Sequence, residues 1–291
     1  PMLLGKGQGM ARRGSRDLRA WCAGALVLAA LVGGACTFTI GRSVEQRDIG
    51  VQRFGSGPRA VLLIGGLHTG AEDNSRMIVE QLAVYLGANP GAVPASVTLY
   101  VLPSANPDGT ARGIHTNARG IDLNRNWPAD DWSSDACHPA SGCRRGLGGP
   151  APLSEPETAA LYNFVATLRP EITIVWHAEA PLVEANEVPG ADVYGQRFAE
   201  ASGYPYVEEW TAYRITGQLI DALEQRLALR AFDVELANCC QITPEEFDRN
   251  LRGLLAVLQE VSGERVATPT AERTPAKPTP TPFRVPDIEV P

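Results

Sequence analysis

The chain of 291 residues lacks any surplus of positive charge, and its formal net charge is −7. The first 40 residues hold five of the 26 basic side chains and one of the 33 acidic ones, so the rest carries 21 basic against 32 acidic residues, near −11. The basic residues form no stripe along the sequence. A phosphate-backbone binder needs such a stripe, so nucleic acid is not an expected partner.

The sequence also lacks internal repeats, and it contains only four histidines. Of its residues 44% are hydrophobic and 20% are charged, an ordinary globular composition with room for one large core or two small ones. Because histidines are so few, each is a candidate for a role in chemistry.

The N-terminal region contains a long apolar run, Ala20–Ile40, preceded by Arg12, Arg13, Arg16 and Arg19. Positive charge before an apolar run is typical of an export signal or a signal anchor, and no polar residue marks the solvent face of a core helix. Residues 1–42 are therefore predicted to direct the protein out of the cytoplasm, secreted or anchored to the membrane. Cleavage, lipidation at Cys36 and retention as an anchor all stay open.

Two cysteines, Cys137 and Cys143, bracket a short loop, CHPASGC. They could form a disulfide in an oxidising compartment or, with His138, a metal knuckle. No second cysteine pair has the spacing of a knuckle, so the disulfide is favoured and His138 is expected to be a surface-loop residue. The pairing of the adjacent Cys239 and Cys240 stays open.

Residues 43–263 are predicted to form a single α/β domain with a mostly parallel, mixed central sheet and helices on both faces. Short β-branched apolar runs predict buried strands at Ala60–Gly65, Val97–Pro103, Ile172–Trp176 and Ala231–Leu236. Helical periodicity fills Ser75–Leu86, Glu155–Leu168, Val193–Ala201, Gly217–Leu227 and Pro244–Val261.

Two helix starts have recognisable signatures. Ser154-Glu155-Pro156-Glu157 has the form of a capping box with proline in the first turn, and Thr243-Pro244 starts the last helix with an Ile242–Phe247 staple. From Glu264 onward proline and threonine dominate without apolar periodicity. Residues 264–291 are therefore predicted to be a disordered tail.

Two histidines follow predicted strands: His68 comes after AVLLIGGL and His177 ends ITIVWH. Side chains at the ends of parallel strands can converge on the crevice at the carboxyl edge of the sheet. Glu72 lies four residues beyond His68. Two histidines and one glutamate leave an open position on tetrahedral zinc, as a catalytic site requires.

Further motifs follow in one order: SANPDG, NARGIDLNRNWP, GGPAPLSEPET, WH, YRITG and DVEL. Together with GGLHTGAE they resemble the zinc metallocarboxypeptidase family over most of Gly65–Leu236. The resemblance implies that family's fold and one zinc ion per chain. It also implies that His68, Glu72 and His177 hold the zinc.

The resemblance assigns further roles residue by residue. Asn124 and Arg125 match the pair that binds the substrate's terminal carboxylate, a task that suits the planar guanidinium fork. Tyr213 matches the mobile tyrosine that closes over substrate, and Glu235 matches the catalytic glutamate. Ile220 falls at the floor of the specificity pocket, where an apolar residue would favour an apolar or aromatic substrate side chain.

The sequence departs from the family pattern at two places. The usual H-x-x-E is here H-T-G-A-E, so Glu72 is one residue further on, with Asp73 as a spare acid. The arginine that stabilises the oxyanion is replaced by His115, and Arg112 is an alternative donor three residues earlier. An imidazole lacks a permanent charge, so this departure bears on efficiency.

The sequence thus predicts a zinc carboxypeptidase that cleaves the last bond of a peptide with a free terminal carboxylate. One alternative is a related hydrolase, either an amidase of cell-wall stem peptides or a deacylase of N-acyl amino acids. SEPET and YRITG favour peptides over acyl-amino acids. A second alternative, motivated by the two departures, is an inactive exported binding module.

Overall fold

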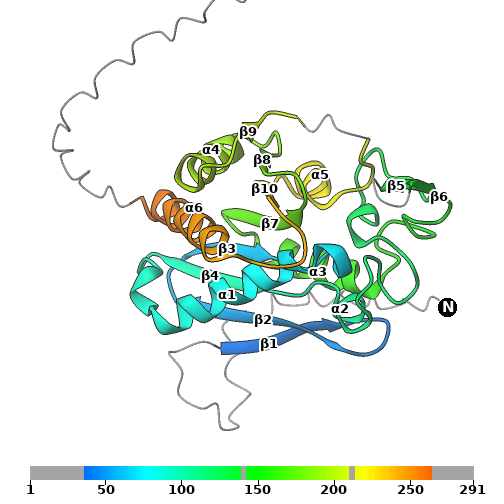
Figure 1. Ribbon diagram of the computed structural model, residues 1–291, viewed down its shortest axis with the longest axis horizontal. Coiled ribbons are helices and arrows are strands. Elements are labelled where there is room, and N and C mark those ends of the chain that lie inside the picture. Colours follow the sequence, from blue (N-terminus) through cyan, green and yellow to red (C-terminus); the bar gives the residue numbers. More distant parts are fainter. Residues whose placement is uncertain (1–35, 139–141, 210–213, 264–291) are drawn as a thin grey trace, which may run out of the picture.

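A mixed eight-stranded sheet forms the centre of the computed structural model, which describes residues 36–138, 142–209 and 214–263 (Figure 1). In spatial order the strands are β1 (Cys36–Arg42), β2 (Asp48–Gly55), β4 (Val97–Leu102), β3 (Arg59–Ile64), β7 (Ile172–Ala178), β10 (Ala231–Leu236), β8 (Leu182–Ala185) and β9 (Tyr206–Val207). The strands from β4 to β10 run parallel, whereas β1–β2, β2–β4 and β10–β8 are antiparallel. The predicted mostly parallel sheet is confirmed.

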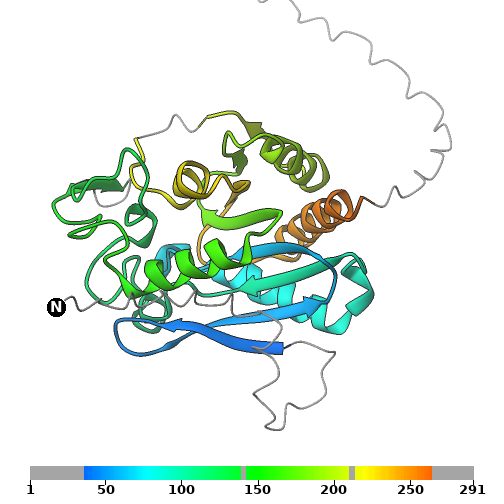
Figure 2. The ribbon, with the colours of Figure 1, turned by 180° about the vertical axis from the view of Figure 1, so that it is seen from behind.

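Helices cover both faces of this sheet (Figures 1 and 2). One core packs against α1 (Asn74–Ala88), α4 (Ala191–Ser202) and α6 (Pro244–Ser262), and the other against α3 (Pro156–Leu168) and α5 (Leu219–Ala222). Strand β3 serves both cores, since Val61 and Leu63 belong to the first and Leu62 and Ile64 to the second. This alternation explains why the strand reads as a continuous apolar run.

Smaller elements lie near the carboxyl edge of the sheet. They are the helix α2 (Pro107–Arg112), the 3-10 turns Gly70–Glu72 and Leu123–Arg125, and a hairpin of β5 (Ala136–His138) and β6 (Gly142–Arg144). A further 3-10 turn, Pro90–Ala92, lies between α1 and the start of β4. Asn106 caps α2, because its Oδ1 accepts a hydrogen bond from the Gly109 amide at 2.9 Å. The NPDG segment is therefore a helix start.

The four predicted strands and five predicted helices are present within a few residues, with one helix altered. The predicted helix Gly217–Leu227 is α5 followed by a π-helical turn, Leu223–Leu227. The cap at Thr243 is confirmed, since its side chain accepts from the Glu246 amide at 3.1 Å. The capping box at Ser154 is wrong: Glu155 is the N-cap of α3, and Ser154 Oγ donates to the Glu155 carboxylate instead.

Strand β1 uses residues that the sequence placed with the export segment. Cys36–Arg42 pairs antiparallel with β2 at the edge of the sheet. The rest of the predicted export segment and the predicted tail lie outside the described residues. Within the ranges that the structure describes, no helix is both long and apolar enough to cross a membrane.

The contact between α4 and α6 depends on Gly253, and this generates a prediction. A Cβ at Gly253 would lie 2.7–2.8 Å from three ring carbons of Phe198, whereas a Cβ at Gly87 in α1 would meet only Phe54 at 3.8 Å. We expect Gly253→Ala to destabilise the fold by about 1–3 kcal/mol through overpacking. Gly87→Ala should be neutral or gain up to about 1 kcal/mol from helix propensity.

Denaturant unfolding of both variants beside the wild type checks this expectation. Equal stabilisation by the two substitutions would show that Phe198 does not pack as described.

Candidate active site

Four candidate site residues lie at the carboxyl edge of the sheet, on or just after three neighbouring strands. His68 lies four residues beyond the end of β3, and Glu72 ends the 3-10 turn Gly70–Glu72 that follows. His177 lies near the end of β7, and Glu235 in β10 is its direct register partner. The predicted convergence at this edge is therefore confirmed by the sheet order.

His68, Glu72 and His177 form a compact buried group. His68 Nδ1 lies 3.0 Å from Glu72 Oε2, and one ligand atom from each of the three residues lies within 4.8 Å of the others. The extra residue of H-T-G-A-E is absorbed by the 3-10 turn, which Gly70 enters with φ of +67°. A left-handed φ of this kind favours glycine, so the turn lets Glu72 point back toward His68.

The buried carboxylate of Asp122 fixes the orientation of the His68 ring. This carboxylate accepts hydrogen bonds from His68 Nε2 at 2.8 Å and from the Asn124 amide at 2.8 Å, and His115 Nε2 lies 3.2 Å away. The second nitrogen of a metal-binding histidine usually bonds to such a carboxylate, which fixes the tautomer and ring orientation. Asp122 thus leaves His68 Nδ1 facing Glu72.

All four histidines of the chain meet here, including one that the sequence assigned elsewhere. His115 stacks on His68 with ring centroids 4.0 Å apart, and His138 lies 4.1 Å from His115. His138 Nε2 is 3.4 Å from Glu72 Oε1, and its side chain is only 13% exposed. The prediction that His138 is a surface-loop residue is wrong, because the β5–β6 hairpin folds inward over the site.

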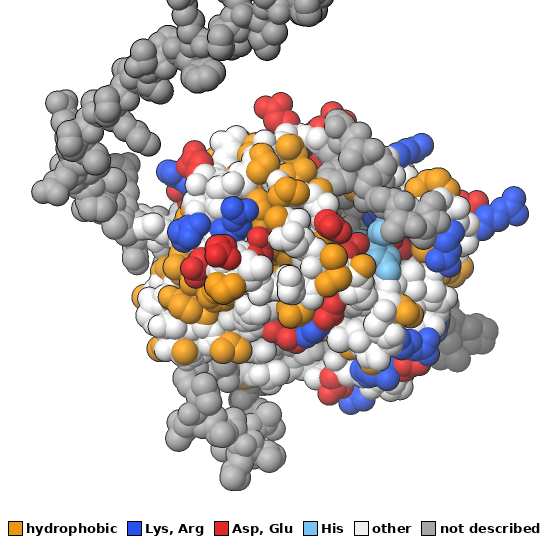
Figure 3. Space-filling view, viewed as in Figure 1, with side chains coloured by type: hydrophobic (Ala, Val, Ile, Leu, Met, Phe, Trp, Pro, Cys, Tyr) orange, Lys and Arg blue, Asp and Glu red, His pale blue; other side chains and the backbone are white. Residues whose placement is uncertain are grey.

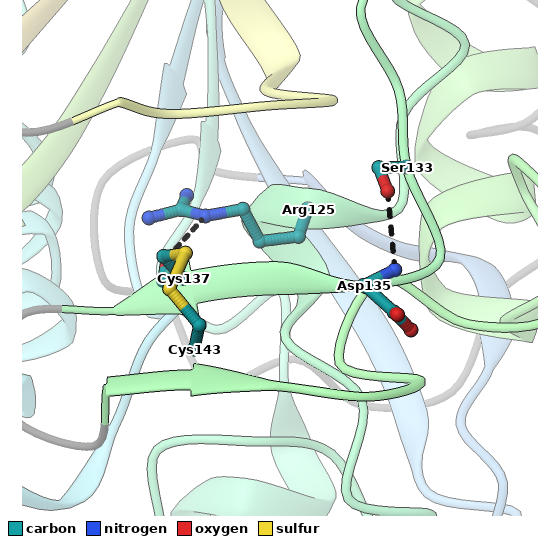
Figure 4. The surroundings of a disulfide bond; sticks show 5 residues. All are labelled: Arg125, Ser133, Asp135, Cys137 and Cys143. Carbon is teal, nitrogen blue, oxygen red and sulfur yellow. Dashed lines mark hydrogen bonds between the residues drawn. A yellow bond between two sulfur atoms is a disulfide. The ribbon is translucent and has the colours of Figure 1, made fainter.

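The disulfide Cys137–Cys143 is confirmed, and it closes this hairpin (Figure 4). The carbonyl of Cys137 accepts a hydrogen bond from Arg125 Nε at 3.2 Å, so the hairpin also holds the guanidinium. Among the described residues, Cys239 and Cys240 are free cysteines.

Burial and mutual charge give the site a strong electrostatic pattern. Burial alone would lower the pKa of His68, but the Asp122 and Glu72 carboxylates beside it raise that pKa to about 10. Burial and the cationic His68 lower the pKa of His177 to about 3. Burial and the nearby Glu72 raise the pKa of Glu235 to about 8. The carboxylates therefore attract positive charge to the position between His68 and His177.

These donors fit zinc. Two imidazoles and one carboxylate are a usual catalytic set. The low pKa of His177 keeps that imidazole neutral, and a metal ion would displace the proton that the neighbouring carboxylates hold on His68. Among the described residues, two other groups could also hold a metal: His68–His115–Asp122 and Glu72–His115–His138. Only the group with His177 is fully buried and includes the register partner of Glu235.

A cavity of about 800 Å³ opens beside these residues. Its lining includes Asn124 and Arg125 as well as Glu235. Arg125 is 1% exposed, and within the described part of the chain no carboxylate lies within 4.0 Å of its guanidinium. A buried cation without a counter-ion is costly, so Arg125 is suited to an incoming anion. Figure 3 shows histidine surface in a hollow between acidic and basic side chains.

Two of the predicted site residues that the structure describes are not brought to the cavity. Arg112 is 44% exposed and forms an ion pair with Glu45. Ile220 lies in α5 and is buried in the core, and it is absent from the lining, where Ile215 and Gln218 are found instead. Tyr213 lies outside the described residues.

The SEPET segment makes hydrogen bonds to other parts of the protein and has a structural role. Asn126 of the DLNRN segment accepts from the Glu155 amide at 3.2 Å and from Thr158 Oγ1 at 2.7 Å, while Asn117 donates to the Glu155 carboxylate at 2.8 Å. The start of α3 therefore fixes the loop that carries Asn124 and Arg125. SEPET consequently gives no support to a preference for peptides over acyl-amino acids.

Comparison with known proteins identifies the family. The sequence profile of the zinc carboxypeptidases, Peptidase_M14, matches residues 34–185, just over half of the chain. The chain belongs to the zinc carboxypeptidase family, as the resemblance implied.

Among curated relatives, Murein peptide amidase A of Escherichia coli (strain K12) is 30% identical over 152 residues, which cover 50% of this chain and 59% of that protein. Carboxypeptidase Z of Rattus norvegicus is 30% identical over 210 residues, 60% of this chain and 30% of that protein. The matched part thus spans less than two thirds of either relative.

Solved structures share the fold. The murein-tripeptide amidase of Escherichia coli O157 gives a TM-score of 0.58 at 24% identity, over 85% of this chain and 97% of that one. Bovine thrombin-activatable fibrinolysis inhibitor gives 0.65 at 18% identity, over 79% and 90%. The predicted zinc carboxypeptidase-like fold is confirmed.

Proposed function

We propose that this chain is a zinc-dependent peptide hydrolase that cleaves the bond preceding a residue with a free carboxylate. His68, Glu72 and His177 would hold one zinc ion. The observation that carries the proposal is the position of Glu235, a partly buried carboxylate in register with His177 at the edge of the cavity. Family membership supports the reaction class.

The residues divide the work between binding and proton transfer. Arg125, held by the carbonyls of Cys137 and Asn124, pairs with the substrate's terminal carboxylate, and Asn124 lies beside it. Bound zinc would supply Lewis acidity to the scissile carbonyl and to water. Glu235 accepts the proton of the attacking water and returns it to the leaving nitrogen, so one carboxylate is base and then acid.

We assign the oxyanion contact to His115 in preference to Arg112. His115 lines the cavity and stacks on His68, whereas Arg112 is directed toward Glu45. An imidazole N–H in a buried cavity can donate to developing negative charge, although more weakly than a guanidinium.

A cell-wall peptide amidase is the second candidate, and the relative named Murein peptide amidase A favours it. Both reactions would use the same zinc site, Glu235 and Arg125, and they differ in the chemical groups on either side of the bond that is cleaved.

The disulfide Cys137–Cys143 supports the predicted location outside the cytoplasm, because disulfides persist in oxidising compartments.

Zinc content and turnover test the proposal. We expect the full chain to bind about one zinc, and His177→Ala to weaken binding at least about a hundredfold, because two ligands hold zinc poorly. Glu235→Gln should keep the zinc and lose about 10²–10⁴ in kcat, since an amide cannot accept a proton. The substrates to be compared are benzoylglycyl amino acids, muropeptides and N-acyl amino acids, one class for each candidate reaction.

Full zinc content in His177→Ala would refute the ligand set. More than about a tenth of wild-type activity in Glu235→Gln would refute the general base. A zinc-loaded wild type that turns over no substrate would be a binding module.

The oxyanion assignment has its own test. His115→Ala should lower kcat/KM at least about tenfold, because one donor to the oxyanion is lost. Arg112→Ala is the matched control and should stay within about twofold, since surface ion pairs contribute little. Steady-state kinetics on one dipeptide decides between them, and the reverse pattern would give the role to Arg112.

A further inference from the structure

Two carboxylates face each other in the cavity at a position that the proposed mechanism does not use. Asp233 in β10 is the direct antiparallel register partner of Glu184 in β8. Direct partners in an antiparallel pair project from the same face of the sheet. Both residues line the cavity that contains Glu235, which lies two residues beyond Asp233 on the same face. Like charges directly opposite one another destabilise a sheet unless a cation lies between them.

Asp233 has no such cation within the described protein. Asp233 is 6% exposed, and its Oδ1 is a buried atom without a hydrogen-bond partner among the described residues. The nearest basic group is His177, whose Nε2 lies 4.0 Å from Oδ1 and beyond hydrogen-bond distance. No arginine or lysine of the described ranges lies within 4.0 Å of this carboxylate. A buried carboxylate oxygen left unpaired is costly, so it indicates a partner that arrives from outside.

The charged residues of the lining, which include a second cation in Arg144, indicate the chemistry of that partner. Arg125 supplies the cavity with an anion-binding group, and Asp233 with Glu184 supplies a cation-binding group. A single amino acid with a basic side chain offers a carboxylate to the first and an ammonium or guanidinium to the second. Ile220, which the sequence predicted as an apolar floor of the specificity pocket, lies in the core. It therefore does not contact a substrate side chain in the cavity.

We propose that Asp233, assisted by Glu184, binds the cationic group of the substrate's terminal side chain, so that the enzyme selects lysine, arginine or a diamino acid. This inference rests on the proposed function, because Arg125 must bind the terminal carboxylate for the side chain to reach Asp233. It replaces the sequence-based expectation of an apolar or aromatic preference.

Kinetics on paired substrates test the selection. With the zinc-loaded full chain, kcat/KM for benzoylglycyl-arginine or benzoylglycyl-lysine should exceed that for benzoylglycyl-phenylalanine at least about tenfold. Asp233→Asn removes the charge at constant shape, and it should reduce this ratio at least about tenfold, mainly through KM for the basic substrates. Glu184→Gln should change the ratio in the same direction.

Glu187→Gln is the matched control. Glu187 is exposed and outside the cavity lining, so this variant removes the same net charge without touching the site. Its arginine-to-phenylalanine ratio should equal that of the wild type, because exposed charges are screened by salt.

Product binding gives a readout that needs no turnover. By calorimetry, free arginine should bind the wild type at least about tenfold more tightly than free phenylalanine, and Asp233→Asn should remove the difference. If no substrate is cleaved but arginine is still selected, the proposed reaction fails and the binding inference stands.

Two results would overturn the inference. One is a wild type that prefers phenylalanine in both assays. The other is an Asp233→Asn variant that loses zinc and slows all substrates equally with an unchanged ratio, since Asp233 would then only orient His177.

Discussion

The hydrogen bond between His68 and the buried Asp122 is the constraint on which the rest of the site depends. Asp122 accepts a hydrogen bond from His68 Nε2 at 2.8 Å. It also caps the turn Leu123–Arg125, because its side chain accepts a hydrogen bond from the Asn124 amide. One carboxylate therefore fixes the imidazole of a proposed zinc ligand and starts the turn that carries Arg125. The distance between the proposed zinc ligands and the Arg125 guanidinium follows from this shared contact.

Other elements hold the same loop in place. Asn126 and Asn117 attach it to the start of α3, and the hairpin closed by Cys137–Cys143 holds Arg125 through a backbone carbonyl. A turn anchored on several sides can keep a buried guanidinium directed at a cavity rather than at a carboxylate of the protein. Such preorganisation reduces the reorganisation needed when substrate binds.

Much of the fold was predictable because its central strands are buried on both faces and read as apolar runs. The convergence of His68, Glu72 and His177 followed from parallel strands that end at one edge. The edge strand β1 was missed, because its residues continue the apolar run Ala20–Ile40.

Site residues at the ends of strands could be predicted from the sequence. Site residues placed by loops or by the register between distant strands could not. His138 reaches Glu72 only because a hairpin folds inward, and no local pattern indicates that path. Asp233 was visible only as part of DVEL, since its opposition to Glu184 depends on an antiparallel register that joins distant segments. Ile220 was assigned by its position in the sequence, yet α5, to which it belongs, directs its side chain into the core.

The central claim is that zinc is held by His68, Glu72 and His177 beside Glu235, and the location of the ion tests it most directly. Anomalous diffraction at the zinc edge from crystals of the zinc-loaded protein would show that location. The account predicts one peak at about 2.0–2.2 Å from an imidazole nitrogen of His68 and of His177 and from a carboxylate oxygen of Glu72. A peak bonded instead to Glu72, His115 and His138, away from Glu235, would contradict it.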